Sequence, residues 1–198
     1  MDITSKNYPG WMSQNLPDFI SRLNDDESKE HLDKFNSLTK EECHKRISLP
    51  WPTKLNLRTV AIQDGFDLSV QNSSNLELFL NTYSSLEVVF WATYDLKAGV
   101  YKGNYNDIVR GWISSEFILS PVSMVAINTE IVIIINEQLS FTLIGASDEK
   151  INYLESLYES TGGMENNFKK SLSNYFKDHK NCDYKWVCEA VLPFCKWF

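Results

Sequence analysis

The residue types best suited to metal binding lie near the C-terminal end of the chain. His179 and Cys182 stand three positions apart, and Cys188 and Cys195 follow them. A zinc ion takes four nitrogen or sulfur ligands, and side chains three positions apart share one face of a helix. However, the cysteine spacings of six and seven residues match no common zinc finger or ribbon, and Cys188 and Cys195 also fit the buried stripe of a helix. A zinc site and a set of small buried thiols both stay open. Of the two, we expect the cysteines to be buried thiols. We therefore expect no bound metal and no other cofactor.

A second pairing of the same residue types, Cys43 followed by His44, could supply a nucleophile and its base. On a helix these neighbours point about 100° apart, so they form no ready dyad. The sequence holds no phosphate-binding glycine loop, dinucleotide fingerprint, nucleophile elbow, His-Glu-x-x-His or Cys-x-x-Cys. We therefore expect no catalytic residue and no enzyme. A hydrolase or transferase that assembles its site from distant carboxylates stays open as the alternative.

Tyrosines, glycines and carboxylates gather in the segment 95–107, which predicts an exposed loop. Tyrosine offers a large contact area at a low cost in conformational entropy, and carboxylates attract the lysines and arginines of a partner. The alternative is that these tyrosines only cover the edge of a sheet. The predicted partner-binding residues are Asp95, Tyr101, Tyr105, Asp107 and Glu116.

The elements that must position these residues begin with predicted helices. Apolar residues recur at helical spacing over 16–23, and a mostly polar helix is expected over 26–38. The sequence Thr39-Lys-Glu-Glu has the form of a capping box and predicts a third helix to about Ile47.

The middle of the chain changes to the strand period. An Asp64-Gly65 turn predicts a hairpin whose second strand runs through Phe66, Leu68 and Val70. The segment 86–94 is rich in β-branched and aromatic residues, which predicts a central strand covered on both faces. Helices are expected on either side of it, over 75–83 and 108–117.

Three short strands follow, over 122–127, 131–135 and 139–145, with connections short enough for tight hairpins. In the middle strand apolar residues occupy both faces, so we expect it to be central. In the last strand Ser140 and Thr142 alternate with apolar residues and predict a wetter face. Helices are then expected from Ser147, over 164–180, and in the tail to about Leu192.

Together these elements predict an α+β fold. We expect a mixed or antiparallel sheet of about five to six strands with a C-terminal β-meander, packed by helices on one face. The whole chain is expected to be a single domain, residues 1–198. Its parts would be a helical N-terminal segment (1–50), an α+β core (51–160) and C-terminal helices (161–198).

The net charge of −7 is unevenly distributed. It is −2 over residues 1–50, −7 over 51–160 and +2 over 161–198. An acidic body lacks the lysines and arginines that replace counterions on phosphates, so we expect no direct nucleic-acid binding. The acidic middle suits a basic protein partner, and it also suits plain solubility.

The first residues, MDITSKNYPGWMSQ, show neither the positive nor the apolar region of a secretory signal. The longest apolar run has five residues, far below the roughly 18 that a membrane-spanning helix needs. We therefore expect a cytoplasmic protein that does not enter a membrane.

The stretch VAINTEIVIIINEQLSFTLIGASDEKINYL, residues 125–154, resembles small bacterial immunity proteins of polymorphic and contact-dependent toxin systems. Several of those families carry a late β-meander whose last strand ends in a Gly/Ala turn and an acidic residue before a closing helix. The matching residues here are Gly145, Ala146 and Asp148. The resemblance implies a stoichiometric inhibitor that binds a cognate toxin domain, often a nuclease. It carries over no binding residues.

The resulting hypothesis is a cytoplasmic, non-enzymatic protein that neutralises a bacterial toxin by protein–protein interaction. Besides the enzyme alternative, a structural or regulatory subunit that docks through its basic C-terminal segment stays open.

Overall fold

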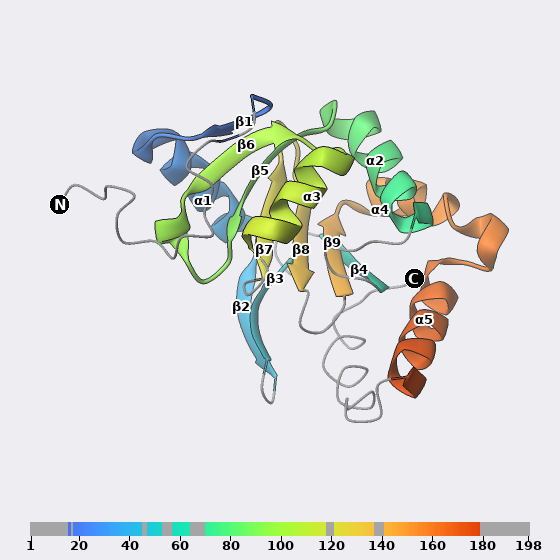
Figure 1. Ribbon diagram of the computed structural model, residues 1–198. Helices are drawn as coiled ribbons and strands as arrows, with labels where there is room; N and C mark the ends of the chain where they lie inside the picture. Colours follow the sequence, from blue (N-terminus) through green and yellow to red (C-terminus); the bar gives the residue numbers. More distant parts are fainter. Residues whose placement is uncertain are drawn as a thin grey trace.

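The computed structural model describes residues 16, 18–44, 47–52, 57–63, 70–117, 121–136 and 141–178 of the 198-residue chain. At its centre lies an antiparallel sheet of seven strands (Figure 1). Across the sheet the order is β1 (Ile20–Arg22), β6 (Val100–Asn104), β5 (Glu87–Ala92), β7 (Val122–Ala126), β8 (Val132–Asn136), β9 (Phe141–Ala146) and β4 (Arg58–Gln63). A separate two-stranded sheet contains β2 (Lys40–His44) and β3 (Ile47–Trp51). The α+β class is confirmed, and so is the C-terminal meander, β7–β8–β9.

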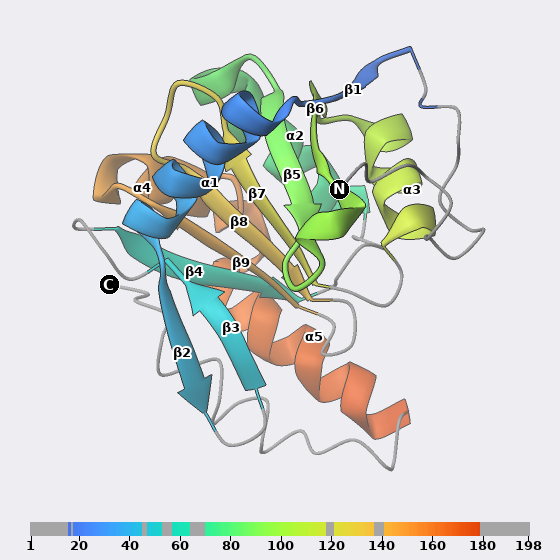
Figure 2. The same cartoon turned by 90° about the vertical axis from the view of Figure 1, so that its left-hand side faces the viewer.

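Helices cover both faces of the seven-stranded sheet, not one face as predicted (Figure 1, Figure 2). One face packs against α2 (Val70–Ser84), α3 (Asp107–Glu116) and α4 (Asp148–Ser156). The other packs against α1 (Asp25–Leu38). Successive side chains of β5 divide between the two sides: Phe90 joins the first apolar cluster and Trp91 the second. The strand therefore has no face in water, as its apolar sequence predicts.

The meander shows the same division between the two faces. In β8, Ile133 packs on the side of α2 and α4, whereas Ile134 packs on the side of α1. The prediction that this strand is covered on both sides is confirmed. The prediction of a wetter face in the following strand is wrong, because every residue of β9 is buried and Thr142 is 0% exposed. Thr142 shares its face with Ile144, which belongs to the cluster beneath α2, α3 and α4.

The edge of the sheet at β4 is closed by a helix. The last described helix, α5 (Met164–Asp178), packs along β4. Its Met164 joins one apolar cluster and its Phe168 joins the other. A helix in this place stops a second chain from adding a strand there. Among the described helices, none combines the length and the apolar composition that a bilayer crossing requires.

The predicted N-terminal helices are only partly correct. The helix over 26–38 is confirmed as α1, but the segment 20–22 is an edge strand that pairs with β6, and the segments 40–44 and 47–51 form the small sheet. Thr39 does not cap a further helix. Its hydroxyl donates to the carbonyl of Phe35 at 2.9 Å and so helps to end α1. The backbone then continues extended, as pairing between strands outweighs a short helical stripe.

The structure also differs from the predictions for the segment 95–107 and for the strand through Val70. The segment 95–107, predicted as a loop, contains β6 and the short helix η2 (Leu96–Ala98). The predicted strand through Val70 is wrong at its end, because Val70 begins α2. The Asp64-Gly65 turn and the predicted tail helix to Leu192 lie outside the described residues.

At Gly145 in β9, the large sheet is in contact with Pro52, the residue that follows β3 of the small sheet. A Cβ placed there would lie 2.2 Å from the Cβ of Pro52, which follows β3. The adjacent Thr59 hydroxyl donates to the Pro52 carbonyl at 2.6 Å. Pro52 is thus held against the sheet, and only a residue without a side chain leaves room for it.

We predict opposite effects of alanine at two glycines. Gly145→Ala must displace Pro52 and should lower the free energy of unfolding by about 1–3 kcal/mol. Gly111→Ala, in α3, meets nothing within 4 Å and should raise it by about 0.5–1 kcal/mol, because alanine favours a helix over glycine. Chemical denaturation of both variants measures the difference, and a neutral Gly145→Ala would show that Pro52 does not pack there.

Candidate functional site

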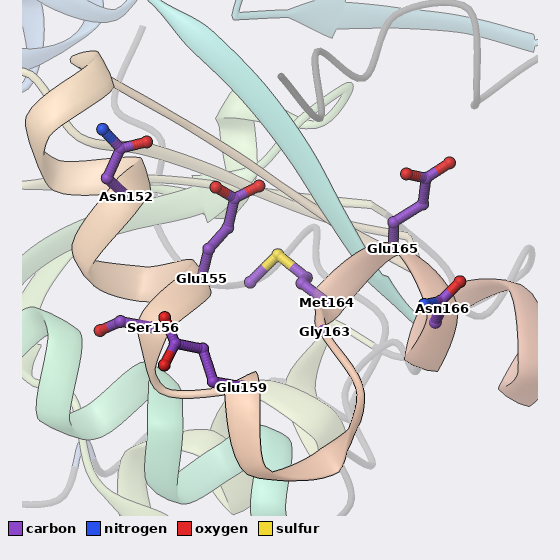
Figure 3. Close-up of a pocket in the computed structure, with 8 residues that line it drawn as sticks. All are labelled: Asn152, Glu155, Ser156, Glu159, Gly163, Met164, Glu165 and Asn166. Atoms are coloured by element: carbon purple, nitrogen blue, oxygen red, sulfur yellow. The ribbon is translucent and has the colours of Figure 1, made fainter.

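A hollow of about 480 Å³ lies between α4 and α5 (Figure 3). Figure 3 shows Met164 between the two helices, with Glu155 on the α4 side and Glu165 on the α5 side. Acidic and amide side chains dominate the wall. The lining residues are Asn152, Glu155, Ser156, Glu159, Gly163, Met164, Glu165 and Asn166.

The turn between α4 and α5 sets the shape of this hollow. Tyr158 anchors it from below: its hydroxyl donates to Asn72 Oδ1 at 2.9 Å, and its carbonyl accepts from the Gly163 amide at 3.1 Å. Gly162 and Gly163 have φ values of 91° and 90°, a region that side chains disfavour. The short helix η3 (Glu159–Thr161) lies just before these glycines. Glu159 and Glu165 are therefore carried on opposite walls by a turn with a fixed geometry.

An ion pair ties the α4 wall to the sheet. Arg58, on β4, is 5% exposed, and its Nη2 lies 2.6 Å from Glu155 Oε1. Its Nη1 donates to Asn152 Oδ1 at 2.7 Å. Asn152 and Glu155 are three residues apart and share a helix face. A guanidinium holding both of them orients two polar residues of the wall.

The charges of the wall favour a cationic ligand. Three glutamates line the hollow, and its described lining residues include no lysine or arginine. Glu165 forms an ion pair with Lys169, one turn further along α5. Among the described residues, no cluster of three or more His, Cys, Asp or Glu is arranged to hold a metal ion. The arrangement is therefore suited to an ammonium or guanidinium group, which needs spaced carboxylates and not a closed shell of ligands.

We predict that Glu155 contributes more to the stability of the fold than Glu159 does. Glu155→Gln removes the charge that faces the buried guanidinium of Arg58 and should lower the free energy of unfolding by about 1–3 kcal/mol. The matched change Glu159→Gln, at an exposed position, should alter it by less than about 0.5 kcal/mol. Thermal and urea unfolding test this. Equal effects would mean that the Arg58–Glu155 pair does not support the wall.

The tyrosines of the predicted binding patch lie in the core. Tyr101 is 6% exposed, stacks on Phe90, and donates its hydroxyl to the Ala98 carbonyl at 2.6 Å. Tyr105 is 0% exposed, and burial raises the pKa of its hydroxyl above the ordinary range. The predicted exposure of these two rings is wrong, because Tyr101 on β6 and Tyr105 just after it both belong to the apolar cluster under α3.

The carboxylates of the predicted patch do not form one surface. Asp95 is exposed and precedes β6, whereas Asp107 is exposed and follows it, so they lie at opposite ends of that strand. Asp107 pairs with Arg110 at 2.6 Å. Glu116 ends α3, and its side chain lies outside the described part.

The candidate metal ligands and the Cys43–His44 pair are not among the described residues that line the hollow. His179, Cys182, Cys188 and Cys195 lie outside the described residues. Cys43 and His44 lie on β2, not on the predicted helix.

The residues of the α4–α5 hollow escaped prediction from the sequence. Their one local signal is spacing: Glu155 and Glu159 are four apart, and Asn152 and Glu155 three apart, on a single helical face. Nothing in the sequence connects them to Arg58, which lies 97 positions before Glu155.

A second charged cluster lies where α2 meets α3. Arg110 pairs with Asp107 through Nη2, and its side chain also faces the buried hydroxyl of Tyr105. Burial, and then the nearby Asp107 carboxylate, raises the pKa of Glu77 above its ordinary value, against the opposite pull of Arg110. The ionised form of Glu77 is therefore less favourable in the folded protein than in the unfolded chain.

We predict a pH-dependent gain in stability for Glu77→Gln. Because the folded pKa of Glu77 is raised, its ionisation disfavours the folded state, and glutamine removes this penalty. The gain should be about 0.5 kcal/mol or less near neutral pH, and it should vanish as pH falls below about 4, where the carboxyl is protonated in both states. Urea unfolding at several pH values measures it. Glu130→Gln, at an exposed turn, is the control, and a gain that persists in acid would contradict the assignment.

Comparison of the chain with protein-family models, with curated protein sequences and with solved structures yields no match. Fold, charge and site geometry are therefore the basis for a functional proposal.

Proposed function

We propose that this chain is a cytoplasmic immunity-type protein that binds and neutralises a cognate bacterial toxin domain by forming a stoichiometric complex. A nuclease is the class of toxin that best matches its charge, because enzymes that act on nucleic acid present basic clefts. The observation that carries the proposal is the acidic hollow between α4 and α5.

Three features of the hollow support a protein-binding role. Its glutamates stand on two helices and a short turn, and the α4 wall is tied to the sheet through Arg58. Such preorganised groups lose little conformational entropy when a partner binds. The hollow also opens at the surface, with Asn152, Ser156, Glu159 and Asn166 all exposed. A lysine or arginine of the toxin could therefore reach its carboxylates directly.

The mechanism that follows is occlusion with electrostatic steering. Acidic side chains on the immunity protein attract the basic cleft of the toxin and speed the encounter. Once docked, the body of the protein would cover the cleft and exclude the nucleic-acid substrate. The partner-binding surface in this proposal is the α4–α5 hollow and not the buried Tyr101 and Tyr105.

We expect the gene next to that of this chain to encode the toxin, and its purified, inactivated toxin domain is the partner to test. The parent protein should form a complex on a sizing column and should rescue growth when expressed with the active toxin. Reversing two charges of the hollow, Glu159→Lys with Glu165→Lys, should slow association about tenfold or more at low salt. The loss should shrink as salt rises, because ions screen exposed charges.

The matched control makes the same charge change on the other side of the sheet. Glu30 and Asp33 are exposed on α1, and their change to lysine should alter the association rate much less. If both pairs slow association equally, the effect reflects net charge and the hollow is not the docking site. If the parent protein forms no complex with the toxin, the proposed function is wrong.

A further inference from the structure

A second hollow, of about 260 Å³, lies between α1, the small β2–β3 sheet and the turn after β5. Figure 2 shows α1 lying across the face of the large sheet, with β2 and β3 projecting beyond its end. This hollow lies on the side of the sheet opposite to α2 and α4, away from the acidic hollow. It plays no part in the function proposed above.

The walls of this second hollow are mainly apolar and aromatic. Phe35 and Trp91 meet edge to face, with ring centroids 4.9 Å apart, and Leu32 and Pro50 extend the surface. Leu96 stands at the rim and is 52% exposed. Ligand pockets of proteins usually measure about 300–1,000 Å³ and are lined mostly by such side chains. This hollow, of about 260 Å³, is slightly smaller than that range and has room for a single small ring.

One polar pair lies in these apolar surroundings. The hydroxyls of Thr93 and Ser123 are 2.9 Å apart, and either could be the donor. Ser123 is 0% exposed, whereas Thr93 is half-buried. A buried donor without a partner is costly, so the Ser123 hydrogen is best used toward the Thr93 oxygen. The two hydroxyls have two hydrogens but share one hydrogen bond, and that leaves the Thr93 hydrogen available to a ligand.

We propose that this hollow is a binding site for a small neutral aromatic molecule that carries a hydrogen-bond-accepting oxygen. The ring would lie against Phe35, Trp91 and Leu96, and its oxygen would accept from the Thr93 hydroxyl, which Ser123 orients from behind. The mainly apolar walls disfavour an anionic ligand, because a carboxylate that enters them loses its hydration. The site therefore selects phenol-like molecules over hydrocarbons of the same shape and over aromatic carboxylates.

Phenol, toluene and benzoate are the probes that test this site on the full chain. Titrations followed by backbone amide NMR should show shifts centred on Thr93, Tyr94 and Leu96. Phenol should bind about three- to tenfold more tightly than toluene, the effect of one hydrogen bond. Benzoate should bind more weakly than phenol. Shifts that centre elsewhere, or equal binding of phenol and toluene, would overturn the proposal.

Two variants measure separately how the Thr93 hydroxyl and the apolar walls contribute to ligand affinity. Thr93→Val keeps the shape and should abolish the preference for phenol over toluene, whereas Thr82→Val, at an exposed hydroxyl on α2, should retain it. A preference that survives Thr93→Val would contradict the assigned donor. Leu96→Ala removes an exposed rim residue, so it should fold, and it should weaken phenol and toluene alike. If Leu96→Ala changes neither affinity, the ring does not bind in this hollow.

Discussion

The structure depends on a sheet that is buried on both faces. Every residue of β7, β8 and β9 is buried, so each of their side chains must pack against a covering element on one side or the other. Burial of a large aliphatic side chain contributes about 1.5–3 kcal/mol, and it does so only where a cover exists. This requirement places α2, α3 and α4 on one face and α1 on the other. The helix α5 contributes to both covers, because Met164 joins one cluster and Phe168 joins the other.

The same requirement decides which parts of the fold could be read from the sequence. Strands such as β5 and β8 are apolar on both faces, a pattern that few other elements share, and they were predicted correctly. The segment 16–23 carried too few apolar residues to distinguish a helix from an edge strand. Thr39 matched a capping box, yet its hydroxyl completes the preceding helix. Thr142 is polar but fully buried, because the face that it shares with Ile144 is covered by α2, α3 and α4.

The candidate site was harder to predict because its residues come together only in the fold. Arg58 and Glu155 lie on β4 and α4, and their ion pair depends on how α4 packs beside the edge strand. The tyrosines of the segment 95–107 were mispredicted for a different reason, which is the ambiguity of the residue type itself. A tyrosine is amphipathic, and its type alone does not distinguish a surface ring from a core ring. In Tyr101 the ring packs on Phe90 and Trp112 while the hydroxyl is satisfied by a local carbonyl.

The Arg58–Glu155 pair also limits how the acidic hollow can act on a partner. Part of the negative charge of Glu155 is already used by a buried guanidinium, and Glu165 is paired with Lys169. Glu159 has no ion pair among the described residues and stands exposed on the turn. A basic side chain arriving here would meet one unshared carboxylate and would compete for another. Exposed pairs of this kind add little affinity each, so the hollow would contribute mainly to the rate and orientation of encounter. Tight binding would then require apolar contacts from the surface around it.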